Sequence, residues 1–174
     1  PYASPSAFAG WDNLTKSTQS HAMDDEAHWL EDWALYCAIK DDQNGKPWYE
    51  WPDSLKNRNE EALAPYQKKL EPYLQAQRSF NTEWQELRLY ANANGVRVIG
   101  DVPIFIAHDS ADVWAHRELF QLDDDGYPTF IAGVPPDYFS ETGQVWETVL
   151  YKWDAHREEQ WTWWKERMKR MFRL

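Results

Sequence analysis

Five acidic side chains in the second half of the chain are candidates for acid–base or nucleophilic chemistry: Asp101, Asp109, Asp112, Asp137 and Glu141. Cleavage or transfer at a glycosidic bond needs two carboxylates that flank the scissile oxygen. The spacing of these five residues along the sequence pairs none of them with another. An unusual hydrolase that uses Asp101 and a second acid roughly 5–10 Å away stays open as an alternative.

Asp101 has the most informative sequence context of the five. It lies in the run VRVIGDVPIFIA, which is apolar and rich in β-branched residues. Such a run predicts a strand over residues 96–106 that is buried on both faces, as in parallel sheets. Ligand groups gather at the carboxyl ends of strands in α/β barrels and open sheets. We therefore expect Asp101 to accept hydrogen bonds from ligand hydroxyls; the alternative is an Asp that caps local amides.

The segment GVPPDYFSETGQVW, residues 133–146, is a second candidate site. Its polar side chains, expected to contact a ligand, are Asp137, Ser140, Glu141, Thr142 and Gln144. Its stacking faces are Tyr138, Phe139 and Trp146, and Gly143 permits a tight bend. Long aromatic loops of this kind usually cover a site. The alternative is a structural loop that packs on neighbouring helices.

The spacing of His108, Asp109 and Asp112 resembles a metal site only superficially. Short spacing of His and Asp is weak evidence without further ligands. Asp109-Ser110-x-Asp112 can equally cap the turn at Trp114. We therefore expect no metal at these residues. The other histidines, His156 among them, have no partner pattern and are expected at the surface.

Composition narrows the range of ligands. The formal net charge of -11 opposes binding to nucleic-acid phosphates and to anionic membranes. The twelve tryptophans mostly suit a core, but a few can present flat faces to the apolar C–H faces of sugars. The single cysteine, Cys37, lies in an apolar helical stretch and is predicted to be a small core residue. A single cysteine fits a reducing compartment, so we expect a cytoplasmic protein.

Local signals predict the elements that position these residues. Asp24 and Asp25 can cap a helix that ends at Asn44-Gly45. The apolar stripe of that helix is Leu30, Trp33, Ala34 and Cys37. The aromatic segment KPWYEWPD, residues 46–53, is bounded by prolines and is predicted to be a packed loop.

A second helix is predicted to be long. Pro65 suits its first turn, Pro72 is expected to kink it, and Asn94-Gly95 ends it. LDDDGYP, residues 122–128, is predicted to be a turn between short extended pieces. A final helix is expected over residues 154–174, with Trp161, Trp164, Met168 and Met171 on one side.

The predicted fold class is α/β, because a helix, a glycine and a buried strand follow one another before residue 106. Only one buried strand is predicted with clarity, whereas a closed parallel barrel needs eight strands. The chain is therefore expected to form part of a larger α/β domain.

Several long motifs carry a resemblance to a known family. The run IGDVPIFIAHDSADVWAHRELFQLDDDGYPTFIAGVPPDYFSETGQVW, followed by LYKWD, closely resembles 4-α-glucanotransferases. This is the amylomaltase or disproportionating-enzyme family, family 77 of the glycoside hydrolases. WLEDWALYCAIK, GKPWYEWP, EWQELRLYANANGVRVIGD and the opening PYASPSAFAG resemble the family as well.

The resemblance implies a (β/α)8 barrel with an inserted helical subdomain. Residues 1–95 would form an N-terminal loop and helical insertion segment. Residues 96–174 would form barrel strand three, a substrate-binding loop and the following helix. The implied activity is transfer of α-1,4-glucan segments between malto-oligosaccharides through a covalent glycosyl-enzyme, without cofactor or metal.

The resemblance also implies substrate-binding roles. Asp101 would bind substrate at the end of barrel strand three, and Tyr2 would stack near the cleavage point. Tyr138 and Phe139 would fold over the acceptor sugars.

Gln144 and Trp146 would lie at the far end of the same loop, near the donor sugars.

The chain departs from the family pattern in ways that bear on catalysis. The nucleophilic Asp of the family lies in an R-I-D-H-F-R motif beyond the sequence that resembles the present C-terminus, and the general-acid Glu and third Asp lie further on. Residues 146–151 read WETVLY where the family reads W-G-x-P-L-Y. The 174 residues are therefore expected to bind substrate without catalysing transfer. A non-catalytic glucan-binding or structural remnant is the alternative.

Overall fold

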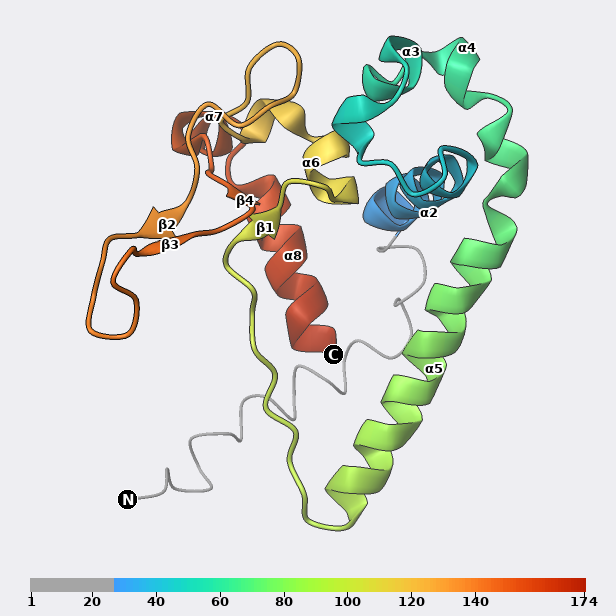
Figure 1. The fold of residues 1–174 in the computed structure, drawn as a ribbon. Coiled ribbons are helices and arrows are strands. Elements are labelled where there is room, and N and C mark those ends of the chain that lie inside the picture. Colours follow the sequence, from blue (N-terminus) through green and yellow to red (C-terminus); the bar gives the residue numbers. More distant parts are fainter. Residues whose placement is uncertain (1–26) are drawn as a thin grey trace.

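The computed structural model describes residues 27–174, which form a mixture of helices and short strands (Figure 1). The α-helices are α2 (Ala27–Asp42), α3 (Asp53–Lys56), α4 (Glu60–Leu63), α5 (Glu71–Ala93), α6 (Ala111–Ala115), α7 (Trp153–Glu158) and α8 (Thr162–Arg173). The strands are β1 (Ile106–Ala107), β2 (Gly133–Val134), β3 (Gln144–Val145) and β4 (Thr148–Val149). The expected caps Asp24 and Asp25 lie outside the described residues.

Helix α2 is the central element of the core. It ends where the sequence predicts, because Asn44 and Gly45 both adopt positive φ and the Gly45 amide donates to the carbonyl of Lys40. Its buried side chains are Ala34, Leu35, Tyr36, Ala38 and Ile39. The buried surface is therefore wider than the predicted stripe, because α5, α6 and the 3-10 turn Tyr66–Lys69 all contact this helix.

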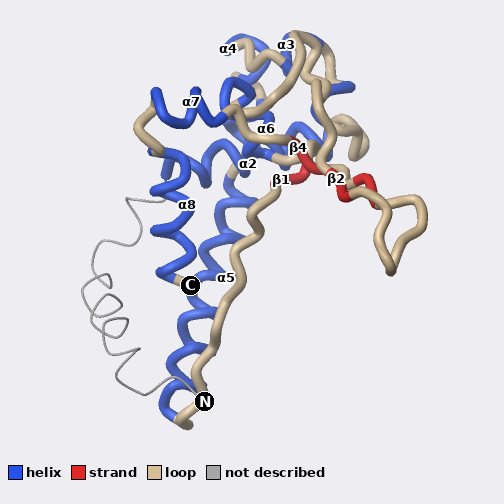
Figure 2. Tube along the Cα trace, turned by 90° about the vertical axis from the view of Figure 1, so that its left-hand side faces the viewer, coloured by secondary structure: helices blue, strands red, loops and turns tan. Residues whose placement is uncertain are grey.

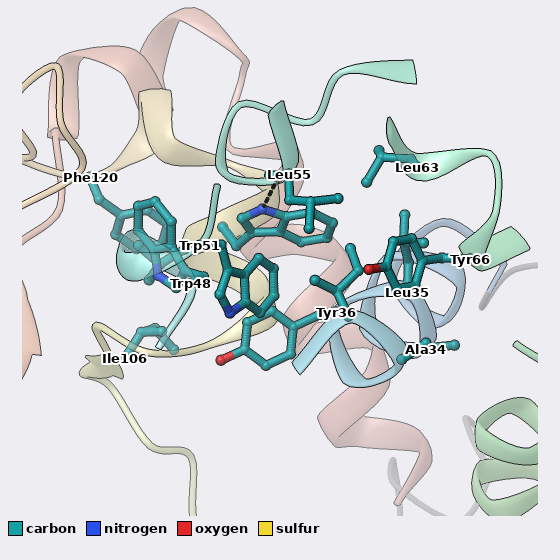
Figure 3. Close-up of a cluster of buried hydrophobic side chains, with 14 of the residues drawn as sticks. Ala34, Leu35, Tyr36, Trp48, Trp51, Leu55, Leu63, Tyr66, Ile106 and Phe120 are labelled. Atoms are coloured by element: carbon teal, nitrogen blue, oxygen red, sulfur yellow. Dashed lines mark hydrogen bonds between the residues drawn. The ribbon is translucent and has the colours of Figure 1, made fainter. Parts of the chain in front are cut away.

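The core around α2 is rich in aromatic rings (Figure 3). Trp48 and Trp114 are fully buried, and Trp51 meets Trp114 edge-on with ring centroids 5.6 Å apart. The indole N–H of Trp114 donates to the carbonyl of Leu55 at 3.1 Å, and that of Trp48 to the carbonyl of His108 at 2.7 Å. The prediction that residues 46–53 are packed is confirmed, but the segment is not all loop, because Trp48–Glu50 forms a 3-10 turn.

Core residues come from both sides of residue 95. The cluster that includes Tyr36 and Trp48 continues through Ile106, Trp114 and Tyr151. The division of the chain at residues 95 and 96 stays a prediction.

The predicted long helix begins later than expected. Pro65 precedes a 3-10 turn, Tyr66–Lys69, and Pro72 lies in the first turn of α5 (Glu71–Ala93) instead of kinking its middle. The missing N–H of proline costs least at a helix start, which explains why α5 begins there. Gly95, with φ +74, ends the helix as predicted. No side chain of α5 is buried, and Leu87 on this helix is 55% exposed.

The prediction of a buried strand over residues 96–106 is wrong for the described chain. Only Ile106 and Ala107 are in a strand, β1, which pairs antiparallel with β4. Residues 96–105 run as a loop from the end of α5 to β1 (Figure 2), and Val98 and Ile99 are 48% and 85% exposed. A strand needs a neighbouring strand to pair with its N–H and C=O groups, and residues 27–174 place no strand beside this segment.

The predicted final helix is broken in two. Helix α7 ends at Glu158 and α8 starts at Thr162, because Gln160 and Trp161 both adopt left-handed conformations. His156 is fully buried beneath this break, so its prediction as a surface residue is wrong. The cause is long-range packing, because Phe120 and Tyr151 cover its ring.

Candidate functional site

The loop over residues 133–146 is a projecting β-hairpin (Figure 1). Strand β2 pairs with β3 through Gly133 opposite Val145 and Val134 opposite Gln144. At the tip, Tyr138 is 96% exposed and Phe139 is 90% exposed. Their rings meet edge-to-face at 5.5 Å and face solvent. The alternative of a loop packed on neighbouring helices therefore does not hold for the tip.

Polar side chains hold the backbone of this hairpin loop. The Asp137 carboxylate accepts from the amides of Phe139 and Ser140 at 2.9 and 2.8 Å. The Ser140 hydroxyl donates to the carbonyl of Gly143 at 2.7 Å. Asp137 and Ser140 were expected to contact a ligand, and they instead bind the backbone of their own loop.

Gly143 closes the hairpin as predicted. Its φ is +73, and a Cβ there would lie 2.5 Å from the Val134 carbonyl oxygen. A side chain at this position would therefore push the two arms of the hairpin apart.

The base of the hairpin contacts the segment that carries Asp101. The ring of Trp146 lies edge-on to that of Phe105 at 5.7 Å, and the Trp146 amide donates to the carbonyl of Ala132 at 2.8 Å. The indole N–H of Trp146 donates to the side-chain oxygen of Gln144 at 3.1 Å. Two predicted site residues, Gln144 and Trp146, are thus in contact with each other.

Asp101 is exposed, and its carboxylate accepts a hydrogen bond from the amide of Val102 at 2.8 Å. This is the local amide contact foreseen in the alternative for this residue. Tyr2, the remaining predicted site residue, lies outside the described residues.

Two residues that the sequence did not single out hold the segment after Asp101. The guanidinium of Arg167 on α8 donates to the carbonyl of Pro103 at 2.8 Å, and the Tyr151 hydroxyl donates to the carbonyl of Ile104 at 2.5 Å. Tyr151 lies in the LYKWD motif, which offered a signal. Arg167 offered none, because its partner is a backbone carbonyl 64 residues away.

His108, Asp109 and Asp112 do not form a metal site. Asp109 accepts from Lys40, from the Tyr36 hydroxyl at 2.5 Å and from the Trp48 amide at 3.3 Å. Burial alone would raise the pKa of Asp109, but the hydrogen bonds from Lys40 and Tyr36 hold that pKa below its usual range. No three His, Cys, Asp or Glu side chains in residues 27–174 are placed to hold a metal ion.

The neighbours of Asp109 also have structural roles. The ring of His108 stacks on Tyr49 with centroids 4.1 Å apart, and burial lowers the pKa of His108. Ser110 caps α6 by accepting from the amide of Val113 at 3.3 Å, as the capping alternative expected. This cluster joins α2 to the start of α6.

The hairpin loop presents the exposed rings of Tyr138 and Phe139, and hydrogen bonds to Asp137 fix its backbone. The neighbouring segment presents the exposed carboxylate of Asp101. Such a combination is typical of a carbohydrate-binding surface. The model of the 4-alpha-glucanotransferase family matches residues 2–174. The 4-alpha-glucanotransferase of Thermus thermophilus is 43% identical over 97% of this chain and 35% of that protein. The chloroplastic/amyloplastic enzyme of Oryza sativa subsp. japonica is 47% identical over 84% of this chain and 25% of that protein.

A solved structure agrees with these sequence matches. An amylomaltase from Streptococcus agalactiae in complex with acarbose superposes with a TM-score of 0.75 at 41% identity, and covers 90% of this chain. The chain belongs to the 4-alpha-glucanotransferase family. It spans between a quarter and about a third of the length of the curated relatives cited above. No helix in the described part is both long and apolar enough to cross a membrane.

Proposed function

We propose that the protein acts in transfer of α-1,4-glucan segments between malto-oligosaccharides, with retention through a covalent glycosyl-enzyme. The 174 residues supply parts of the substrate-binding surface, and the resemblance assigns the catalytic carboxylates to other family motifs. The observation that carries this proposal is the Tyr138–Phe139 pair, 96% and 90% exposed on a loop that its own polar groups hold in place.

The side chains divide the work of binding a glucan. Tyr138 and Phe139 stack on the apolar faces of acceptor glucose units, since aromatic rings present suitable flat surfaces. Gln144 and Trp146 lie near donor sugars, and Asp101 accepts a hydrogen bond from a glucose hydroxyl. Covering the sugars also excludes water, which a transferase needs because water competes for the glycosyl-enzyme.

We further propose that the whole protein is a (β/α)8 barrel with an inserted helical subdomain. The exposed apolar side chains of Val98 and Ile99 support this, because barrel neighbours would cover them. The chemistry needs no metal or cofactor. A cytoplasmic location fits the single Cys37, although the names of plant relatives place those enzymes in plastids.

Binding and turnover test the proposal separately. The 174-residue chain is titrated with maltoheptaose while tryptophan fluorescence is recorded, and incubated with maltotriose while glucose release is measured. We expect a saturable fluorescence change and no glucose above a boiled control. The double variant Tyr138→Ala, Phe139→Ala should lose at least fivefold in affinity. Tyr90→Ala is the matched control, because Tyr90 is 70% exposed on α5.

Other outcomes point elsewhere. Glucose release by the 174 residues would contradict the assignment of the catalytic groups to other motifs. A cooperative thermal melt with no response to maltoheptaose would indicate a structural remnant instead.

A further inference from the structure

Two tryptophans outside the candidate site are exposed to solvent. Trp153 begins α7 and is 50% exposed, and Trp161 directly precedes α8 and is 39% exposed. Their ring centroids are 6.2 Å apart, with an angle of 40° between the planes. We call Trp153 and Trp161 the indole pair. Its two rings present neighbouring apolar faces, whereas Trp48 and Trp114 have none exposed.

The backbone holds Trp161 in an unusual conformation. Its φ is +61 and its ψ is 26, in the left-handed region that bulky residues rarely enter. The Trp161 amide donates to the carbonyl of His156 at 2.8 Å, which fixes the turn between α7 and α8. Strained backbone of this kind is concentrated at functional sites, so the conformation itself motivates a search for a ligand.

One buried ring and one partly buried ring pack against the indole pair. The ring of His156, fully buried, lies nearly parallel to that of Trp161, at 13° and 6.3 Å. The Trp153 ring lies at 20° to that of Trp164, with centroids 6.2 Å apart, and 5.7 Å from that of His156. The orientation of the indole pair is therefore set before any ligand arrives, which lowers the entropic cost of binding.

The surroundings of the indole pair are polar. Asp154 and Arg157 form an ion pair at 3.0 Å, and their side chains are 85% and 71% exposed. They offer an acceptor and several donors on the same short helix as Trp153. Flat apolar faces bordered by exposed hydrogen-bonding groups match a glucose unit, which has an apolar C–H face and a rim of hydroxyls.

We propose that the indole pair is a second α-glucan-binding surface, on different elements from the Tyr138–Phe139 hairpin. It holds a remote part of a long glucan, or another branch of a polymer, while the hairpin contacts the sugars next to the cleavage point. Two linked contacts on one polymer raise its affinity without any new contact at either surface. The inference rests on the proposed function for its ligand class, a neutral α-1,4-glucan.

Affinity electrophoresis of the 174-residue chain in gels that contain glycogen tests this inference, because it does not depend on tryptophan fluorescence. Four proteins are compared: the parent chain, the hairpin variant Tyr138→Ala, Phe139→Ala, the indole variant Trp153→Ala, Trp161→Gly, and their combination. Glycine suits the left-handed position of Trp161, so the indole is removed without backbone strain. We expect at least a threefold rise in the apparent dissociation constant for the indole variant, and at least a tenfold rise for the combination.

The outcomes separate this inference from the proposed function. Parent-like retardation of the indole variant, with weakened retardation of the hairpin variant, would overturn the inference and leave the proposed function standing. The reverse pattern would support the indole pair and contradict the role of the hairpin. Loss of retardation in the parent chain would overturn both.

Folding and specificity need their own controls. Each variant must give a cooperative thermal melt; if Trp153→Ala fails this test, Trp161→Gly alone carries the comparison. Trp161→Phe keeps a stacking face and should restore retardation to within twofold of the parent. Equal retardation of the parent in gels that contain a soluble β-1,4-glucan would contradict the assignment to α-glucans.

Discussion

The aromatic core and the hairpin tip use the same kinds of side chain in opposite ways. In the core, Trp114 is fully buried and its indole N–H donates to the carbonyl of Leu55. Removing this ring would therefore disturb the packing of the fold. At the tip, Tyr138 and Phe139 contact each other, while Asp137 fixes the backbone. The loop conformation therefore does not depend on its rings. This separation leaves the rings available to a ligand at little cost to stability.

Truncation in the core gives the largest expected effect. Trp114→Ala should lower the free energy of unfolding by about 3–5 kcal/mol, as for other large-to-small core changes. The change also removes the donor to Leu55 and the ring beneath the Arg58 guanidinium, which lies 4.4 Å from the ring centroid. Urea denaturation measures the loss. A loss below about 1 kcal/mol would show that the core is not the part that defines the fold.

The charged contact at the edge of the core comes next. Asp109→Asn weakens the hydrogen bonds from Lys40 and Tyr36 and should cost about 1–3 kcal/mol at neutral pH. Asp101→Asn is the matched control, because Asp101 is exposed and its carboxylate accepts from the neighbouring amide of Val102. We expect the control to change stability by less than about 0.5 kcal/mol.

The pH dependence of the same variant has a defined sign. The folded-state pKa of Asp109 is lowered, so its contribution is complete above the unfolded pKa, about 3.9, and is lost as pH falls through the folded value. Thermal melts from pH 7 to pH 3 should therefore show a steeper acid loss for the parent than for Asp109→Asn. Parallel curves would contradict the role of this carboxylate.

Features set by neighbouring residues could be predicted from the sequence. The end of α2 at Asn44-Gly45, the packed segment 46–53 and the bend at Gly143 each depend on a local signal. The exposed rings Tyr138 and Phe139 follow from the same kind of signal, because prolines and a glycine bound their loop. In these places, the chain obeys backbone preferences that extend over a few residues.

Features that depend on distant partners could not be predicted in this way. Residues 96–105 have the composition of a buried strand, but residues 27–174 offer them no strand to pair with. The break between α7 and α8 replaces a helix that periodicity predicts, because packing around His156 overrides it. The contact from Arg167 to Pro103 likewise joins residues far apart in the chain. The family resemblance supplied roles for Asp101 and Tyr138 that no spacing could give.

The same type of turn follows one helix at the core and one helix at the surface, so glycine substitutions at the two turns compare the two regions. Helices α3 and α7 end in the same turn, with a non-glycine residue at left-handed φ: Arg58 at 56 and Gln160 at 60. Glycine is the usual residue there. Gln160 is exposed, so Gln160→Gly should raise the melting temperature by about 2–4 °C, equivalent to about 1 kcal/mol.

Arg58 should respond in the opposite direction. Its side chain pairs with Asp32 and lies over Trp114, so Arg58→Gly loses more contacts than it gains in backbone freedom. We expect a net loss of about 1 kcal/mol by thermal melting. If both glycine variants stabilised the chain, the contact of Arg58 with the core would contribute nothing to the free energy of unfolding.

The smallest expected effect on stability is at the hairpin tip. Tyr138→Ala, Phe139→Ala should change the free energy of unfolding by less than about 0.5 kcal/mol, because both rings are almost fully exposed. Asp137→Ala is the informative contrast, since it removes the acceptor for two loop amides and keeps both rings. It should loosen the loop, which faster hydrogen exchange at Phe139 and Ser140 would report. If the ring variant, and not Asp137→Ala, accelerated that exchange, the rings would hold the loop, and the separation between fold and binding surface would fail.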